Sequence, residues 1–152
     1  MAESLGYCRK AKGLLLFAYC ILPSHVHLIF KDKNKNPGNL LKEIKTFTSK
    51  QLQIQIQENP QESRKEWLLW LMHRAGKKNT NVKNSQFWQQ HNKLIELWSN
   101  KVIDQKIEYV HNNPVDAGFV IKPEHWKYSS ASNYAGLGGA IEIDKIDVRL
   151  YN

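Results

Sequence analysis

The sequence predicts a mixed α/β fold in which a β-hairpin is combined with several helices. An apolar run at 14–22 is broken by Pro23 and Ser24 and is followed by a second short run at 25–30. This is the pattern of two strands joined by a turn. Further along, apolar residues recur at helical spacing. A length of 152 residues is typical of one domain, so we expect a single domain over 1–152.

Four helices are expected from apolar periodicity, over residues 2–12, 39–57, 61–75 and 100–112. Gly13 is expected to end the first helix, because glycine readily adopts the left-handed conformation that follows many helices. Ser99 or Asn100 is expected to cap the last helix, and Pro114 and Gly118 to end it.

The connecting segments are mostly polar. Residues 31–38 (KDKNKNPG) are expected to form a basic loop, and Asn59-Pro60 to separate the second helix from the third. Gly76 should end the third helix, and the Lys- and Asn-rich segment 76–85 is expected to be a mobile loop. The mixed segment 87–98 is interpreted as a pair of strands.

Composition and net charge indicate which partners and which location to expect. The chain has 22 Lys and Arg against 14 Asp and Glu, a net charge of +8. Such a surface favours polyanions, so nucleic acid is the first expected partner. No apolar run reaches the ~18 residues of a membrane span, and the first residues do not have the pattern of a targeting signal, so we expect neither feature. Cys8 and Cys20 are too few for a disulfide framework. We therefore expect a soluble, cytoplasmic protein without membrane contact.

His25 and His27 are the first candidate site. Residues two apart on a strand point to the same face, and the apolar residues that alternate with them should face the core. The two imidazoles should then lie side by side on the opposite face. Two neutral imidazoles hold a divalent cation when a third ligand comes from elsewhere. The alternative is a pair of half-exposed strand histidines that bind nothing.

Two other chemistries of paired histidines fit less well. A histidine-triad hydrolase needs a third alternating histidine, but position 29 is Ile. A zinc hydrolase needs further histidine or acidic ligands at close spacing. The other histidines are scattered: His73, His91, His111 and His125.

Tyr109 is the second candidate. The apolar stripe of its helix consists of Ile103, Ile107 and Val110. At ~100° per residue, Tyr109 lies roughly 120° from the centre of that stripe, so it should not face the core. Gln105 and Asn113 lie four residues away on either side and share its face, although Pro114 disfavours helical geometry at Asn113. The alternative is a surface tyrosine with polar neighbours.

The remaining tyrosines are weaker candidates. Tyr7 and Tyr19 are expected in the core, and Tyr128 and Tyr134 belong to an aromatic tail that is expected to pack. A tyrosine hydroxyl attacks a phosphodiester when a metal polarises the phosphoryl oxygen. A strand-borne histidine pair that faced a helix-borne tyrosine would therefore suit a nuclease.

Several stretches resemble one family. Residues 19–30 (YCILPSHVHLIF) resemble the HUH signature, two histidines around a bulky apolar residue, of single-tyrosine transposases. Residues 107–120 (IEYVHNNPVDAGFV) resemble the tyrosine-bearing helix of that family, and 126–131 (WKYSSA) its C-terminal segment. With FWQQHN at 87–92, the similarity covers most of the chain. Within the insertion-sequence-200-like group, these blocks most resemble the REP-associated tyrosine transposases.

The resemblance implies an antiparallel sheet with helices, related to the ferredoxin-like arrangement. His25 and His27 would match the metal-binding pair, and Asn113 the polar third ligand. Tyr109 would match the nucleophile that cleaves single-stranded DNA and stays joined to its 5′ phosphate, leaving a 3′-OH. The metal would be Mg²⁺ or Mn²⁺, and the substrate a DNA hairpin with a single-stranded flank.

The resemblance also implies a strand before the first helix, whereas Met1 falls inside that helix. We therefore expect an N-terminally truncated version of the fold. Its sheet would be rearranged or completed by a partner, as in a homodimer. The strand at Leu14 to Leu22 would be paired with another chain or left as an exposed apolar edge. The alternative is a different strand order without a gap.

The predicted function is a metal-dependent DNA transposase or endonuclease. The alternative is a non-catalytic module that binds DNA hairpins, and a purely structural basic domain is a third class. A covalent protein–DNA adduct separates the first class from the second, and salt-sensitive DNA binding separates both from the third. The expected phosphate contacts are Lys31, Lys33, Lys35, Lys77 and Lys78.

Overall fold

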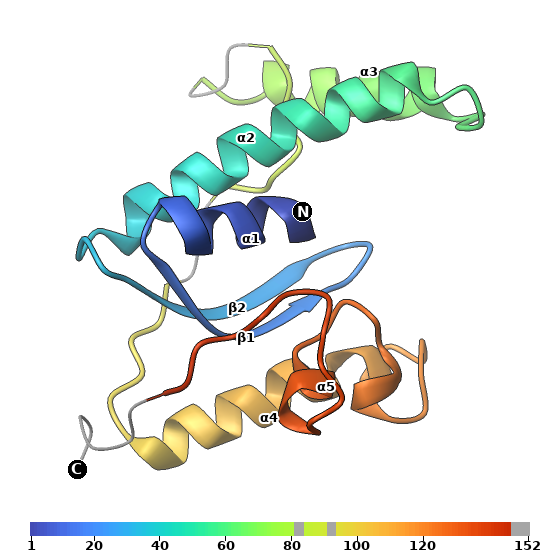
Figure 1. The fold of residues 1–152 in the computed structure, drawn as a ribbon. Helices are drawn as coiled ribbons and strands as arrows, with labels where there is room; N and C mark the ends of the chain where they lie inside the picture. The colour runs from blue at the N-terminus through green and yellow to red at the C-terminus, as the bar shows by residue number, and fades with distance from the viewer. Residues whose placement is uncertain (81–83, 91–93, 147–152) are drawn as a thin grey trace. The chain divides into compact units, whose positions relative to one another are not determined.

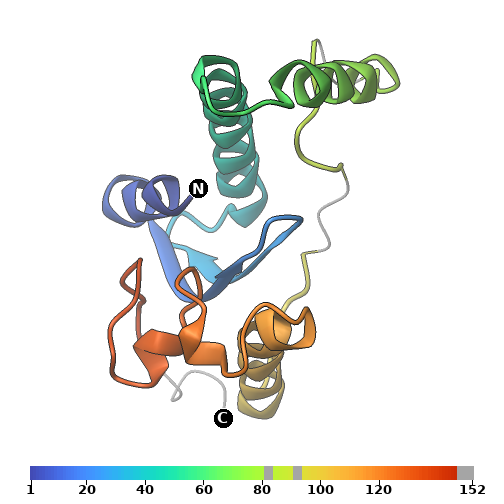
Figure 2. The ribbon, with the colours of Figure 1, turned by 90° about the vertical axis from the view of Figure 1, so that its right-hand side faces the viewer.

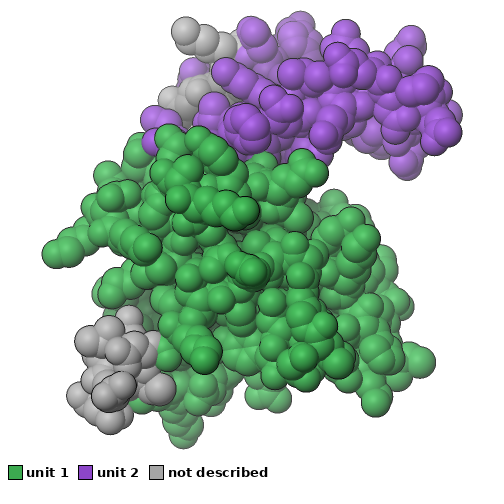
Figure 3. Space-filling view, in the orientation of Figure 1, with its two compact units in different colours: residues 1–40, 95–152 green, residues 41–94 purple. Residues whose placement is uncertain are grey.

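The computed structural model of the protein describes residues 1–80, 84–90 and 94–146. The chain divides into two compact units, which we call unit 1 (residues 1–40 and 95–152) and unit 2 (residues 41–94) (Figure 3). Within the described residues the elements are α1 (Ala2–Ala11), β1 (Leu14–Ile21), β2 (Val26–Asp32), α2 (Pro37–Glu58), α3 (Lys65–Lys77), α4 (Asn100–Asp116), the short 3₁₀ helix η1 (Pro123–His125) and α5 (Ala131–Tyr134).

The expected mixed α/β class is confirmed. The described residues contain five α-helices and one antiparallel sheet of two strands. The ferredoxin-like arrangement and the single domain over 1–152 stay predictions.

The hairpin of unit 1 forms where the sequence predicted it. β1 and β2 pair from Leu14 opposite Asp32 to Ile21 opposite Val26. The turn at the tip is closed by a hydrogen bond of 2.9 Å from the Leu22 N–H to the His25 carbonyl. The strand pairing continues to Asp32 and α2 begins at Pro37, so the basic loop is shorter than expected.

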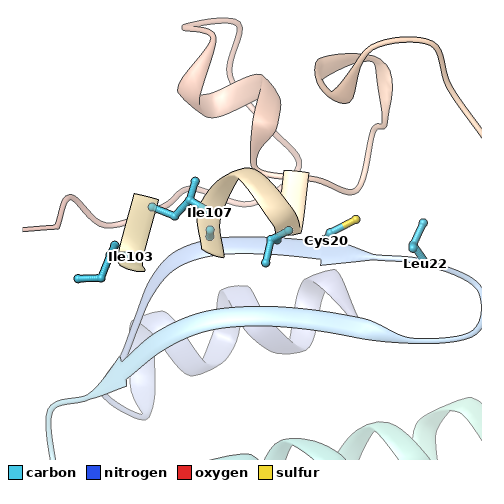
Figure 4. Close-up of a cluster of buried hydrophobic side chains, with 6 residues drawn as sticks. Cys20, Leu22, Ile103 and Ile107 are labelled. Atoms are coloured by element: carbon cyan, nitrogen blue, oxygen red, sulfur yellow. The ribbon is translucent and has the colours of Figure 1, made fainter. Parts of the chain in front are cut away.

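Two helices cover opposite sides of the hairpin. Both ribbon views show α1 on one side and α4 on the other (Figures 1 and 2). The apolar stripe of α4 packs against β1, as Figure 4 shows for Ile103 and Ile107 beside Cys20 and Leu22. Ile103, Ile107 and Val110 are at most 9% exposed, which confirms the buried face that the periodicity of α4 predicted.

The edge of β1 that faces away from β2 is covered by the chain itself. The Ile21 N–H donates to the Tyr128 carbonyl, and the Ser130 N–H donates to the Tyr19 carbonyl, each at 2.9 Å. The Ser130 hydroxyl accepts from the Tyr19 N–H at 2.9 Å. The segment after α4 thus bonds to the backbone of β1 without forming a regular strand.

A second contact covers the other end of the same edge. The Asp144 carboxylate accepts from the Leu16 N–H at 2.8 Å, and the Asp144 N–H donates to the Leu16 carbonyl at 2.7 Å. Arg9 of α1 donates two hydrogen bonds to the same carboxylate. The expectation that β1 would be exposed or would pair with another chain is therefore wrong, because a segment interpreted only as an aromatic tail satisfies its edge.

α4 is longer than predicted. Ser99 caps it, and the Ser99 hydroxyl accepts from the Val102 N–H, as expected. Pro114 lies inside the helix, which runs to Asp116. Proline forfeits one helical hydrogen bond, but its fixed φ suits a helix, and Pro114 is almost completely buried. Gly118 follows the helix with a φ of +74°, in the left-handed region.

Unit 2 contains most of α2, the whole of α3 and the segment that follows. The Trp88 indole N–H donates to the Thr48 hydroxyl at 2.9 Å, and the Gln86 N–H donates to the Met72 carbonyl at 2.8 Å. Segment 84–90 therefore bonds to helices. No strand is present within 84–90 or 94–98, so the expected strand pair is wrong for these residues; positions 91–93 lie outside the described ones.

α3 also departs from its expected bounds. It begins at Lys65 because residues 59–64 form turns, with the Asn59 carboxamide oxygen accepting from the Gln61 N–H. Gly76 lies inside α3 and does not end it. A Cβ at this position would lie 2.8 Å from the Ser85 Cα, so a glycine is needed for the close approach of the two segments. Of the expected mobile loop, positions 81–83 lie outside the described residues.

Candidate active site

His25 and His27 lie next to each other at the start of β2. His27 is opposite Cys20 in the register of the hairpin, and His25 directly precedes the strand. Their ring centroids are 4.9 Å apart, with the rings nearly perpendicular. The predicted juxtaposition of two imidazoles is therefore present, and their role as metal ligands stays a prediction.

Tyr109 of α4 lies beside this histidine pair. Its ring centroid is 5.4 Å from that of His27. The side chain is 53% exposed, so its hydroxyl can meet a substrate, while Val110 next to it is buried. Tyr109 therefore lies off the core face of its helix, as its angular position predicted.

The Asn113 side chain contacts both α4 and the histidine pair. Its carboxamide oxygen is 3.3 Å from His25 Nε2, and its amide nitrogen donates to the Tyr109 carbonyl at 2.7 Å. The second bond fixes the direction of the carboxamide, so its oxygen faces the imidazole. Asn113 is helical although it precedes Pro114, which keeps it one turn after Tyr109.

The local environment favours a neutral imidazole at His27. Burial lowers the pKa of His27, and the neighbouring His25 lowers it further; a hydrogen bond with Asn113 acts in the opposite direction. Neutral imidazole is the form that binds a metal. On the other side of His25, the Ser24 hydroxyl is 2.9 Å from Nδ1, and this contact orients the ring.

The donor set fits an open metal site. Two imidazoles and one carboxamide oxygen are available, and the described residues hold no group of three or more His, Cys, Asp or Glu side chains that could bind a metal. Neighbouring ligands of an octahedral cation with bonds of ~2.1 Å are about 3 Å apart, and His25 Nε2 and the Asn113 oxygen are 3.3 Å apart. Such a set leaves positions for water and substrate and suits modest affinity.

Lys106 is a site residue that the sequence analysis missed. Its Nζ is 5.5 Å from the ring centroid of Tyr109, one turn along the same exposed face. The i−3 spacing was visible in the sequence, but lysine is common on exposed helix faces. Its ammonium group provides a positive charge beside the ring of Tyr109.

Two of the other tyrosines have hydroxyl groups that already bond to the backbone. Tyr19 is buried and its hydroxyl bonds to the backbone of Ile141, and the hydroxyl of Tyr134 donates to the Phe17 carbonyl. Tyr7 is 60% exposed, so its expected place in the core is wrong: it lies on the outer side of α1. Burial raises the pKa of the Cys20 thiol to about 11, which makes it a poor nucleophile.

The five candidate DNA-binding lysines are all exposed, but they form two groups. Lys31, Lys33 and Lys35 lie at the end of β2 and in the turn after it, in unit 1. The buried Asp32 carboxylate organises this turn by accepting from the Asn34 and Asn36 N–H groups. The second group, Lys77 and Lys78, lies at the end of α3 in unit 2.

The other described histidines belong to other elements than the pair does. His73 bonds to the Asn84 carbonyl in unit 2, and His111 bonds to the Ser130 hydroxyl on another side of α4. His125 lies in η1, and His91 is outside the described residues.

Comparison with known proteins supports the resemblance seen in the sequence. The chain is 28% identical over 120 residues to a protein of Haemophilus influenzae described as "Putative REP-associated tyrosine transposase". The matched stretch covers 74% of this chain and 56% of that relative, so the chain spans a little over half of the relative's length. No protein-family model and no solved structure matches the chain significantly. Within the described residues, no helix is long and apolar enough to cross a membrane.

Proposed function

We propose that the chain belongs to the REP-associated tyrosine transposases and is a metal-dependent DNA endonuclease and strand transferase. The observation that carries this proposal is the position of Tyr109, on α4, beside the imidazole of His27, on β2. The similarity to the Haemophilus influenzae relative supports it independently. The proposed substrate is single-stranded DNA next to a hairpin, in the cytoplasm.

The cleavage step follows from the nucleophile. The Tyr109 oxygen attacks the phosphorus of a phosphodiester, and the bond between phosphorus and the 3′ oxygen of the preceding nucleotide breaks. The phenol proton is released, and the departing 3′ oxygen takes up a proton to become a 3′-OH. The products are a 5′-phosphotyrosine and a free 3′ end. The new ester preserves the energy of the broken one, so a second 3′-OH can attack it and rejoin the strand.

The residues around Tyr109 have separate tasks. His25, His27 and Asn113 would hold Mg²⁺ or Mn²⁺, with Ser24 orienting His25. Such a cation, when bound, polarises the phosphoryl oxygen and stabilises the leaving oxygen. Phosphoryl transfer of this kind depends mainly on positioning and on stabilising charge. The exposed lysines supply contacts along the phosphate backbone.

Two preparations of one strand, labelled at the 3′ end and at the 5′ end respectively, test this proposal. The protein is incubated with a DNA hairpin that carries a single-stranded flank, in the presence of Mn²⁺, and then denatured. We expect a covalent adduct that retains a label at the 3′ end of the strand and releases a label at the 5′ end. An adduct that retains only the 5′ label would contradict the proposed linkage. Salt-sensitive hairpin binding without any adduct would favour the non-catalytic binding module instead.

A further inference from the structure

α3 carries large apolar side chains on two opposite faces. Met72 and Gly76 are buried and mark the face that packs within unit 2. Trp67, Trp70 and Leu71 are 54%, 51% and 36% exposed. At ~100° per residue these three lie within about 100° of one another, and the centre of the arc that they span lies about 150° from Met72. This second face is not buried by the packing of unit 2, so it is a candidate binding surface.

The exposed face is basic as well as aromatic. The guanidinium carbon of Arg74 lies 5.1 Å from the ring centroid of Trp70, in cation–π contact. At the end of α3, Lys77 and Lys78 share this face with Arg74. One exposed carboxylate, Glu66, lies four residues before Trp70, so cations outnumber anions on the face. The surface therefore favours a polyanion over a basic or neutral partner.

We propose that this α3 surface, formed by Trp67, Trp70, Leu71 and Arg74, binds the unpaired bases of single-stranded DNA. Exposed indoles stack on bases whatever their sequence, while neighbouring cations contact the phosphates. Paired bases are stacked inside a duplex and are not available to the indoles. A single strand is therefore the polyanion that uses both features of this surface. The inference deepens the proposed function, because it names where the single-stranded flank binds.

A stacking test uses a short oligothymidylate, which cannot form a hairpin. A fluorescent strand of about 12 nucleotides is titrated with the protein and followed by anisotropy. The Trp67→Ala/Trp70→Ala variant should bind at least about tenfold more weakly, since each base stacked on an aromatic side chain is worth ~1–3 kcal/mol. The Trp67→Phe/Trp70→Phe variant should retain most of the affinity. Far-UV circular dichroism checks that both variants remain helical.

Trp98 provides the matched control. It is 72% exposed and is not part of the α3 surface, so Trp98→Ala should leave the affinity for the oligothymidylate unchanged within about twofold. The Trp67→Ala/Trp70→Ala variant should bind a duplex of the same length almost as tightly as the parent protein does. If this variant loses as much affinity for the duplex as for the single strand, the tryptophans do not act by stacking on unpaired bases. That result would overturn the stacking proposal.

Two further outcomes separate this inference from the proposed function. If the double alanine variant binds the oligothymidylate as tightly as the parent, the surface has another role. A shift from dimer to monomer in sedimentation would then identify a second copy of the chain as its occupant. If no protein forms a DNA adduct but the double variant still loses single-strand affinity, the proposed cleavage fails and the stacking surface stands.

Discussion

The imidazole of His27 and the phenol ring of Tyr109 lie edge to face, with their centroids 5.4 Å apart. One ring belongs to β2 and the other to α4, and the two elements approach because the apolar stripe of α4 packs on β1, the partner of β2. The contact that buries Ile107 therefore also positions Tyr109 beside the histidine pair. The packing of α4 on β1 therefore both stabilises the hairpin and sets the geometry of the site.

Removal of the Tyr109 hydroxyl should abolish the covalent adduct. The side chain is 53% exposed, and its hydroxyl forms no hydrogen bond to another described residue. Tyr109→Phe should therefore change the free energy of unfolding by less than about 0.5 kcal/mol and leave hairpin affinity nearly unchanged. Denaturing gel electrophoresis after incubation with DNA and Mn²⁺ measures the adduct. Tyr7→Phe, at an equally exposed tyrosine of unit 1, is the control that should retain it. An adduct in Tyr109→Phe would place the nucleophile elsewhere.

Loss of both imidazoles should remove cation binding. His25→Ala/His27→Ala leaves only the Asn113 oxygen of the proposed ligand set, so Mn²⁺ affinity should fall at least about tenfold, which corresponds to ~1.4 kcal/mol. The signal of free Mn²⁺ in electron paramagnetic resonance reports the binding. The matched control is His73→Ala/His125→Ala, at two exposed histidines that lie on other elements, α3 and η1. Equal binding by the parent and the His25/His27 variant would refute the site.

The parts of the site that lie on one element could be predicted from the sequence. Alternation places His25 and His27 on one face, and a spacing of four places Asn113 one turn from Tyr109. The approach of the two elements could not be derived in this way, because it depends on tertiary packing of α4 on the hairpin. The resemblance to a family implied that approach, and the structure shows it as a 5.4 Å ring contact.

The errors of the sequence analysis have local physical causes. Pro114 was expected to end a helix, but a proline whose ring is buried can stay inside one. The edge of β1 was expected to be open, because an irregular segment that bonds to it through Ser130 and Asp144 has no periodic signal. Side chains of Ser and Asp can replace strand backbone as partners, and no pattern of apolar residues reveals this.

Lys106 should support the reaction through its charge. Lys106→Gln removes the ammonium group near the Tyr109 ring while preserving most of the side chain. Exposed charge interactions are worth ~0.2–1 kcal/mol and weaken with salt. The initial rate of adduct formation should therefore fall about two- to fivefold at low salt, with little difference at high salt. Lys101→Gln, at an exposed lysine near the start of α4, is the control. An equal reduction at all salt concentrations would indicate a role other than charge.

Asp144 should be important for the stability of unit 1. Its carboxylate accepts from the Arg9 guanidinium and the Leu16 N–H, and both donors lose their partner in Asp144→Ala. We expect a loss of about 1–3 kcal/mol in the free energy of unfolding, measured with urea. Glu142→Ala is the control: Glu142 also lies near Arg9, at 3.6 Å, but its side chain is 91% exposed. That substitution should have almost no effect.

The same carboxylate should make stability depend on pH. Burial alone would raise the pKa of Asp144, but hydrogen bonds from Arg9 and Leu16 outweigh it and hold the pKa below its ordinary value. The native state thus favours the ionised form more than the unfolded state does. The stabilisation is complete above the unfolded pKa of ~3.9 and is lost as the pH falls through the lower native value. The difference between the parent and Asp144→Ala should shrink in urea titrations below about pH 4.

The two lysine groups should contribute separately to the salt dependence of DNA binding. Each phosphate contact releases counterions, so the slope of log affinity against log salt should become less negative by ~0.7–0.9 for each contact that is lost. We expect a change of about 2–3 for Lys31→Gln/Lys33→Gln/Lys35→Gln and of about 1–2 for Lys77→Gln/Lys78→Gln. Anisotropy titrations with a labelled hairpin between 50 and 200 mM salt, roughly the range in which such slopes are resolved, measure both.

The choice of DNA should distinguish the two groups further. Lys77 and Lys78 follow the α3 surface, so their loss should weaken single-strand binding more than duplex binding. Lys31, Lys33 and Lys35 lie at the end of β2 and in the turn after it. Because β2 also carries His27, their loss should weaken hairpin binding and slow adduct formation together. A control with Lys101→Gln and Lys122→Gln, at two exposed lysines that belong to neither group, changes the net charge of the protein. If this control shifts the slope as much as the triple variant does, the net charge of the protein and not the proposed contacts governs DNA binding.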